Sequence, residues 1–332
     1  MAQNVYVVLG SNSFSGGWMV DTLLGDNKDH SVIGISRSPE KSGLFLPYKS
    51  KVSHNVSFYQ LNLNSDTQKI FDLLDEIQPQ YIINFAAQGE VGTSWLYPEQ
   101  WFQTNTLGIV KLCNFLKDKK YLKCYVHIST PEVYGSCNNV AESAPINPST
   151  PYAASKAAAD FFVQMLVKQY GFPMIMVRST NVYGAHQQLY RIIPRSIIYL
   201  LAKKKILLHG GGKAIKSYIH IKDVCRGILK AIKLNKTGSI YHFSPAESIA
   251  IRDLVKEICG KMGCNYNKVT ENTGERPGQD ACYIIDSSKA RKELSWQPEI
   301  SLEEGLPEVI NWTKSNYNKI MQEPLEYVHL PY

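Results

Sequence analysis

Short apolar runs alternate with segments of helical spacing along the first half of the chain. Each run is hydrophobic at nearly every position, which indicates strands buried on both faces of a parallel sheet. The intervening segments place apolar residues three or four positions apart, as amphipathic helices do. The predicted strands cover residues 4–10, 31–36, 56–63, 81–87, 124–130 and 173–180. The predicted helices cover residues 16–25, 70–77, 105–120 and 151–171. This alternation predicts an α/β fold, with a doubly wound parallel sheet covered by helices on both faces.

The regular alternation ends near residue 185, where loops lengthen and glycine-rich turns such as residues 209–213 appear. We therefore predict a first domain over residues 1–184 and a smaller α/β lobe over residues 185–332. A short apolar run at residues 239–245 is predicted to return one strand to the first domain.

Composition narrows the class of protein. The chain has 332 residues, of which 44% are hydrophobic and 20% charged, as in an ordinary globular protein. The net charge of +7 comes from scattered lysines and arginines, so we expect an anionic small molecule as partner and no nucleic acid. Seven cysteines, without a C-x-x-C pair, and the absence of a signal peptide or a long apolar run predict a cytoplasmic protein with no membrane partner. The histidines lack metal-ligand spacing, so no metal is predicted.

The turn after the first predicted strand reads GSNSFSG and opens the first helix. Glycines and backbone amides at a helix N-terminus suit the pyrophosphate of a dinucleotide. Ser13 occupies the middle position of the usual three-glycine form, but its small side chain still permits close approach. The predicted contacts are Gly10, Ser13, Phe14, Ser15 and Gly16. The alternative is an ordinary strand-to-helix turn.

The end of the second predicted strand bears on the choice of dinucleotide. An acidic residue here would suit the ribose hydroxyls of NAD. The chain has Ser36 and Arg37 instead, a hydrogen-bond donor and a permanent cation that suit a 2′-phosphate. The prediction is therefore NADP, with NAD as the alternative. Arg37 as a plain surface residue is the competing interpretation.

Tyr152 and Lys156 lie four residues apart at the start of a predicted helix, so their side chains share one helix face. A nearby ammonium lowers the pKa of a tyrosine, which can then accept a proton from a sugar hydroxyl while hydride leaves the same carbon. The same spacing at Tyr218 and Lys222 is interpreted as chance, because only the first pair follows a strand that ends in Ser-Thr.

Several segments occur in the order of a known family: NFAAQ, TNTLG, STPEVYG, PYAASK, RSTNVYGAHQ and RPGQD. With them, the chain resembles the extended short-chain dehydrogenases/reductases, and more narrowly the nucleotide-sugar 4,6-dehydratases that act on dTDP-glucose and GDP-mannose. The resemblance implies a Rossmann-type fold, a nucleotide-diphosphate sugar bound by the C-terminal lobe, and a nicotinamide cofactor that stays tightly bound and is regenerated in each turnover. It also implies a homodimer formed through helices near residues 104–118 and 152–169.

The resemblance assigns catalysis to Thr130, Glu132, Tyr152 and Lys156. It implies that Tyr152 assists oxidation at C4, Glu132 removes the C5 proton, water leaves from C6, and hydride returns to C6. Relatives of the dTDP-glucose type have an aspartic acid where this chain has Pro131, so a separate acid is missing. Glu132 serving both steps is one hypothesis. A second is that dehydration is lost and only epimerisation remains, and a third is that Glu132 caps a local turn.

Further positions match by resemblance alone. The cofactor-side matches are Asn62, Leu63, Ala86 and Asn105, and the substrate-side matches are Gln88, Asn181, Arg191, Lys216 and Arg276. The segment around Gln88 gives a slight preference for a GDP-linked sugar. The alternatives to a 4,6-dehydratase are an NDP-sugar 4-epimerase, a C6-decarboxylase and, in another class, a non-catalytic dinucleotide-binding regulator.

Overall fold

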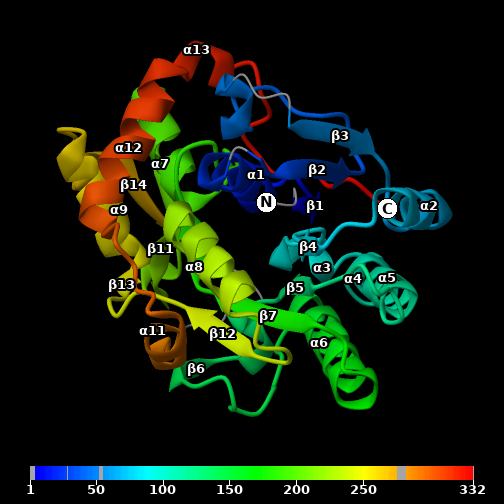
Figure 1. Ribbon diagram of the computed structural model, residues 1–332. Helices are drawn as coiled ribbons and strands as arrows, with labels where there is room; N and C mark the ends of the chain where they lie inside the picture. Colours follow the sequence, from blue (N-terminus) through cyan, green and yellow to red (C-terminus); the bar gives the residue numbers. More distant parts are fainter. Residues whose placement is uncertain (1–3, 28, 52–54, 275–281, 332) are drawn as a thin grey trace.

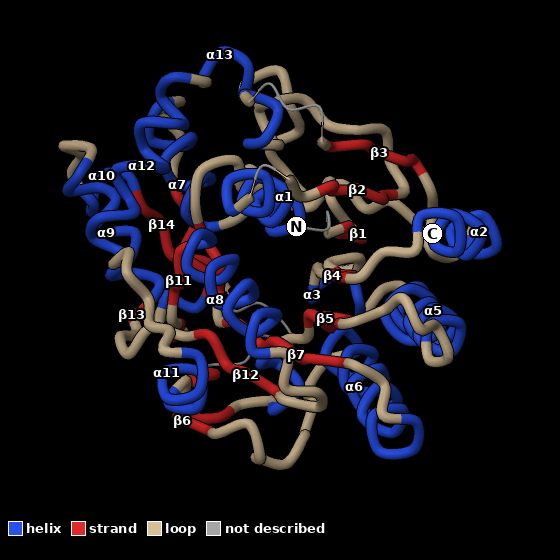
Figure 2. Tube along the Cα trace, viewed as in Figure 1, coloured by secondary structure: helices blue, strands red, loops and turns tan. Residues whose placement is uncertain are grey.

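Parallel strands form the central sheet of the computed structural model, which describes residues 4–27, 29–51, 55–274 and 282–331 (Figures 1 and 2). Seven strands of the described chain belong to this sheet, in the order β12-β7-β5-β4-β1-β2-β3. They are β1 (Val5–Leu9), β2 (Ser31–Ser36), β3 (Val56–Gln60), β4 (Tyr81–Asn84), β5 (Cys124–Ile128), β7 (Met174–Ser179) and β12 (Ile240–Phe243). The predicted α/β class is confirmed. Strand order changes direction at β1, where doubly wound sheets bind ligands.

Neighbouring residues of β1 belong to two separate cores. Tyr6 and Val8 pack into one hydrophobic cluster, and Val7 and Leu9 pack into another on the opposite face. Because side chains alternate across a strand, both faces of the sheet must be apolar, which explains the unbroken hydrophobic run in the sequence.

Helices cover the two faces of the sheet (Figure 1). The first core takes side chains from α1 (Phe14–Asp26), α8 (Ile221–Leu234) and α12 (Leu302–Ser315), and the second from α2 (Thr67–Ile77), α5 (Gly108–Leu116) and α6 (Pro151–Tyr170). Helix α6 matches its predicted span because Thr150 caps its start, Pro151 opens it and Gly171 ends it with a φ of 64°.

The smaller lobe has its own core between α7 (Ile192–Leu201), α9 (Ile251–Lys261) and α12. Two-stranded sheets pair β8 (Asn181–Tyr183) with β11 (Tyr218–His220), β9 (Ile206–His209) with β14 (Thr270–Thr273), β10 (Ile215–Lys216) with β13 (Ile249–Ala250), and β6 (Cys137–Val140) with β15 (Tyr283–Ile285). The remaining helices are α3 (Val91–Ser94), α4 (Pro98–Phe102), α10 (Tyr266–Val269), α11 (Ser288–Leu294) and α13 (Tyr317–Ile320). Strand β12 leaves this part of the chain and pairs with β7.

Some element boundaries differ from the prediction. Strand β4 ends at Asn84 instead of residue 87, because the Asn84 side chain accepts the amide of Ala86 at 3.0 Å and turns the chain. Strand β3 ends at Gln60. In the region of the predicted helix at 105–120, the structure has three consecutive elements. Helix α4 leads into a π-helical turn at Gln103–Leu107, and this turn leads into α5.

No disulfide joins the seven cysteines in the described part of the chain, and Cys113, Cys124, Cys225 and Cys259 are buried. Tyr218 lies on β11 and Lys222 on α8, so their spacing does not place them on one helix face. Within the described ranges, no helix is both long and apolar enough to cross a membrane.

Candidate active site

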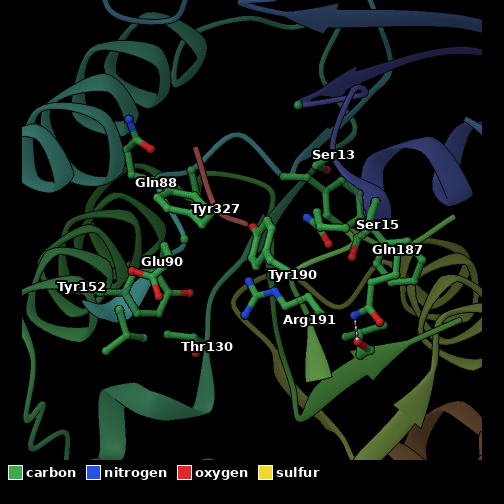
Figure 3. Close-up of a pocket in the computed structure, with 18 of the residues that line it drawn as sticks. Ser13, Ser15, Gln88, Glu90, Thr130, Tyr152, Gln187, Tyr190, Arg191 and Tyr327 are labelled. Atoms are coloured by element: carbon green, nitrogen blue, oxygen red, sulfur yellow. Dashed lines mark hydrogen bonds between the residues drawn. The ribbon is translucent and has the colours of Figure 1, made fainter. Parts of the chain in front are cut away.

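A cavity of about 1140 Å³ lies at the carboxyl ends of β1, β2, β4 and β5 and extends to the C-terminal lobe (Figure 3). The predicted site residues that line it are Gly10, Ser13, Phe14, Ser15, Ser36, Arg37, Asn62, Leu63, Ala86, Gln88, Thr130, Glu132, Tyr152, Lys156, Asn181, Arg191 and Lys216. Gly16 and Asn105 are not part of the lining. Arg276 lies outside the described residues.

The β1–α1 turn fits the pyrophosphate prediction. Ser13 caps α1, and its hydroxyl accepts the amide of Gly16 at 3.0 Å. Gly10 has a φ of 78°, and a Cβ there would stand 2.6 Å from the backbone nitrogen of Ala86. The turn thus needs glycine at position 10 both for conformation and for close packing on the residues after β4. A Cβ at Gly16 would collide with the Gly10 carbonyl, so this glycine lets the turn close instead of lining the cavity.

The pair predicted to bind a 2′-phosphate has other partners. The Ser36 hydroxyl is buried and accepts the amide of Asn12 at 3.0 Å, which fastens β2 to the β1–α1 turn. Arg37 Nη1 donates to the carbonyl of Pro331 at 3.0 Å. The Asn12 side chain in turn donates to Ser38. Ser36 therefore serves the fold of the turn, and one arm of Arg37 is committed to the C-terminal segment.

Asn105, predicted as a cofactor contact, is a buried support. Its side chain accepts the amide of Gln88 at 2.9 Å and donates to the Gln88 carbonyl and to the Ser155 hydroxyl, each at 3.0 Å. The π-helical turn in which it lies orients it toward both partners. Asn105 thus connects the loop after β4 to α6 without reaching the cavity.

The segment Thr130–Tyr134 explains the proline at position 131. Residues Pro131–Tyr134 form one 3-10 turn, with Thr130 as its cap and Pro131 at its first position. The Thr130 hydroxyl accepts the amide of Glu132 at 3.3 Å. Because proline has a fixed φ and needs no amide partner there, it holds this turn rigid and directs Glu132 to the cavity.

Tyr152 and Lys156 project from the first turns of α6 toward this segment. Lys156 is buried and donates to the carbonyl of Ile128 at 2.7 Å, and burial lowers its pKa to about 8 against the opposing charge of Asp160. The pKa of Tyr152 is raised, first by burial and then by the Glu132 carboxylate, while a hydrogen bond with Thr130 opposes the rise. We expected Lys156 to lower the pKa of Tyr152. That expectation is wrong for the protein's own groups, because burial and Glu132 raise this pKa.

A buried charge cluster behind the cavity was not predicted. Asp160, one turn after Lys156, accepts from Ser129 at 2.6 Å, Arg178 at 2.7 Å and His127 at 3.1 Å. Burial alone would raise the pKa of Asp160, but these partners outweigh it, and the pKa is lowered. The cluster connects β5, α6 and β7, and it adjoins Thr130 through the preceding residue, Ser129. Its members are far apart in sequence, so no local motif could indicate it.

The substrate-side predictions fall on two different surroundings. Asn181 accepts from the Tyr283 hydroxyl at 2.9 Å, and the Lys216 ammonium is buried 3.9 Å from the centre of the Tyr283 ring. Arg191 is exposed to the cavity, with its guanidinium over the ring of Tyr190. A flexible, exposed arginine suits a diphosphate better than the enclosed Lys216 does.

Sequence reasoning missed part of the cavity wall. Glu90, Tyr190 and Tyr327 face the cavity in Figure 3, beside Gln88 and Arg191. The rings of Tyr190 and Tyr327 meet edge to face, with centroids 5.3 Å apart. Tyr327 belongs to the last residues of the chain, and neither spacing nor periodicity places that segment at the site.

Comparisons with known proteins agree with this geometry. Residues 7–309 match the family model described as GDP-mannose 4,6 dehydratase. The human dTDP-D-glucose 4,6-dehydratase is 29% identical over 329 residues, which cover 96% of this chain and 93% of that protein.

Two solved structures have the same overall fold. The crystal structure of DesIV, a dTDP-glucose 4,6-dehydratase from Streptomyces venezuelae with NAD and TYD bound, superimposes with a TM-score of 0.87 at 28% identity, covering 95% of this chain and 98% of that one. UDP-glucuronic acid 4-epimerase from Bacillus cereus, in complex with UDP-glucuronic acid and NAD, gives a TM-score of 0.85 at 25% identity and covers 94% and 100%.

Proposed function

The chain belongs to the GDP-mannose 4,6 dehydratase family, and on that premise we propose that it converts a nucleotide-diphosphate hexose into the 4-keto-6-deoxyhexose by loss of water. Membership makes it an extended short-chain dehydrogenase/reductase with nucleotide-sugar 4,6-dehydratase character and a nicotinamide dinucleotide as cofactor. The observation that carries the proposal is the Thr130–Glu132 turn, which holds a carboxylate beside Tyr152 in one cavity.

Tyr152 is the proposed proton acceptor for the C4 hydroxyl, and Thr130 holds that oxygen in place. When bound, a nicotinamide dinucleotide would supply the hydride acceptor, and its cationic ring would favour the ionised form of a tyrosine beside it. Lys156 lies beside the tyrosine with its ammonium anchored on Ile128. The β1–α1 turn, with Ser13 and Ser15 at its rim, would hold the pyrophosphate.

Glu132 is the proposed base for C5 and the acid for C6. Once it has taken the C5 proton it is a neutral carboxylic acid, and it can return that proton to the departing C6 hydroxyl as the C5–C6 double bond forms. Such a dual role needs a rigidly held carboxyl group in a dry site. Pro131 provides rigidity, and its buried side chain excludes water from one side of the turn.

The proposed cofactor is NAD. The NADP prediction depended on Ser36 and Arg37, and both have protein partners in the structure. The two solved structures described above hold NAD. Extraction of the bound cofactor, followed by chromatography, distinguishes NAD from NADP.

The preference for a GDP-linked sugar finds no support in the relatives described above, which carry dTDP and UDP names. It depended on the segment around Gln88, whose side chain binds the C-terminal segment instead. We propose residues 185–332 as the lobe that binds the nucleotide sugar, with Arg191 toward the diphosphate.

A second candidate function is 4-epimerisation. It is favoured by Pro131, which occupies the position of the separate acid, and by the fold shared with a 4-epimerase. Epimerisation needs Thr130, Tyr152 and Lys156 but no base at C5, so the presence of Glu132 favours the dehydratase.

The test is mass spectrometry after incubation with GDP-, UDP-, CDP- and dTDP-hexoses in heavy water. Dehydration gives a product lighter by one water that carries one deuterium at C5, and it identifies the substrate. A product of unchanged mass with an inverted C4 would support epimerisation and contradict dehydration. The Tyr152→Phe variant is the control, because it removes the C4 proton acceptor in both mechanisms.

We also propose a homodimer. Phe161 and Met165 on α6 are 55% and 58% exposed, and Leu107 beside α5 is 48% exposed, so large apolar side chains are exposed on these two neighbouring elements. Static light scattering should report twice the mass of one chain, and the Phe161→Asp/Met165→Asp variant should shift it to one chain. A monomeric wild-type protein would exclude the dimer.

A further inference from the structure

The segment Glu326–Pro331, near the C-terminus, runs across the cavity in an extended form and is here named the C-terminal strap. In Figure 1 the red trace leaves α13 and ends at the C label between α2 and β4. Leu325, Tyr327 and His329 are partly buried, whereas Glu326, Val328 and Leu330 are exposed. This period of two is that of an extended segment with one face packed on the protein.

The strap is attached at its start to α7. The Glu326 carboxylate accepts from the Tyr199 hydroxyl at 2.8 Å and lies 3.4 Å from the Arg195 guanidinium. The next residue, Tyr327, packs on Tyr190, just before α7. These contacts come from the C-terminal lobe.

His329 attaches the strap to α4, on the other side of the cavity. Its ring stacks on Tyr97 at 5.2 Å and on Trp101 at 5.4 Å, with interplanar angles of 6° and 12°. Its Nε2 pairs with the side-chain oxygen of Gln100 at 2.8 Å. Two aromatic contacts and one hydrogen bond from His329 to α4 and the residue before it make this a specific attachment.

The final attachments cross the dinucleotide turn. Gln88, after β4, donates to the carbonyl of Leu330 at 3.0 Å, and Arg37, after β2, donates to the carbonyl of Pro331. Strand β1 lies between β4 and β2 in the sheet. A backbone held at both neighbours must therefore pass over the carboxyl end of β1, where the Gly10–Gly16 turn begins.

The strap lines the cavity without filling it. The cavity keeps about 1140 Å³ with the strap in place, and Tyr327, Val328 and Leu330 line it together with Ser13 and Arg37. This volume lies just above the usual range of about 300–1,000 Å³ for small-molecule sites, so it has room for a dinucleotide. The described residues thus enclose the space for a dinucleotide between the β1–α1 turn and the strap.

We propose that the C-terminal strap retains the dinucleotide by closing the outer side of its binding cleft. The proposal rests on the proposed function, in which the hydride returns to the sugar and the dinucleotide never needs to leave. The strap bridges the two lobes, so release requires its attachments at His329, Leu330 and Pro331 to open. Retention therefore depends on strap residues outside the proposed catalytic group of Thr130, Glu132, Tyr152 and Lys156.

The test measures dinucleotide release directly. The holoprotein is loaded with radiolabelled NAD, freed of excess label by gel filtration, and chased with unlabelled NAD while the retained label is counted. We expect His329→Ala and a truncation after Val328 each to release label about tenfold faster, since such changes act mostly on dissociation rates. Gln322→Ala, at an exposed residue before the strap, is the matched control and should release label at the wild-type rate.

Release at the wild-type rate by both strap variants would overturn the proposal. So would slower release or a higher NAD content after truncation, because either would make the strap an obstruction. A wild-type protein that binds no dinucleotide would contradict both the retention by the strap and the proposed function. If release responds as expected but no sugar of the panel is converted, only the proposed function fails. Thermal melting of each variant reports whether it is folded.

Discussion

Single residues decide the chemistry that this site can perform. Pro131 removes a separate acid, yet it also begins the rigid turn that presents Glu132. Thr130 serves both partners, since its hydroxyl caps the Glu132 amide and hydrogen-bonds Tyr152. Asp160 accepts hydrogen bonds from Ser129 and Arg178, so a buried ionic cluster adjoins this turn and stabilises it. A buried charge of this kind is costly unless every partner is present.

At the same scale, the Glu132→Gln variant should separate oxidation from dehydration. Glutamine keeps the size of the side chain but cannot accept the C5 proton, so water loss should fall by about 10²–10⁴-fold. Oxidation at C4 depends on Tyr152 and should persist, which stopped-flow absorbance of reduced nicotinamide would show. Glu132→Asp keeps the charge but has a shorter side chain, so its rate of water loss should lie between those of the wild type and Glu132→Gln. Dehydration by Glu132→Gln at the wild-type rate would rule out Glu132 as the base.

At the scale of elements, close packing of a helix on a strand positions α8 against the central sheet. Helix α8 lies against β12, and a Cβ at Gly227 of α8 would stand 2.6 Å from the ring of Phe243. Phe243 is fully buried and packs on Trp296, with ring centroids 4.6 Å apart. The glycine thus allows the chain to return β12 to the sheet beneath α8.

Gly227→Ala should therefore destabilise the protein. Overpacking costs about 1–3 kcal/mol, more than the helix propensity of about 1 kcal/mol that alanine adds. Gly260→Ala in α9 is the matched control, because nothing lies within 4 Å of its Cβ position, and it should raise the free energy of unfolding. Urea titration measures both. Equal effects of the two substitutions would contradict the packing argument.

For the whole molecule, buried histidines couple stability to pH. Burial is the largest cause that lowers the pKa of His127, His186, His220 and His242, the last to about 3. The folded protein keeps these rings neutral at pH values where the unfolded chain, with an ordinary pKa of 6.5, binds protons. The unfolded state then holds more protons, so the free energy of unfolding falls as pH falls.

The free energy of unfolding should therefore decrease by at least about 2 kcal/mol from pH 6.5 to about pH 5, since each tenfold difference in proton affinity between the folded and unfolded states corresponds to about 1.4 kcal/mol per group. Urea unfolding at several pH values measures it. The His242→Asn variant should show a smaller decrease, and His209→Gln, which is not one of these four histidines, should show the wild-type decrease. A free energy that is constant over this range would contradict the expectation.

The sequence by itself determined the class of fold and a set of site residues, most of which line one cavity. Continuous apolar runs, helical spacing and the Thr150-Pro151 start with its Gly171 end are local signals, and each acts through backbone geometry or burial that depends on neighbouring residues. The glycine-rich turn and the segments around Thr130 and Tyr152 follow strands of one parallel sheet, whose carboxyl ends meet at one edge.

Tertiary structure alone decided the use of these residues. Ser36 and Arg37 carry groups that suit a phosphate, but the fold gives them Asn12 and Pro331 as partners. The Asp160 cluster and the C-terminal strap join residues tens to hundreds of positions apart, such as Gln88 and Leu330. Such contacts follow from how elements pack and how the chain returns to the site. A local pattern cannot encode them, because their energy depends on burial and partners that exist only after folding.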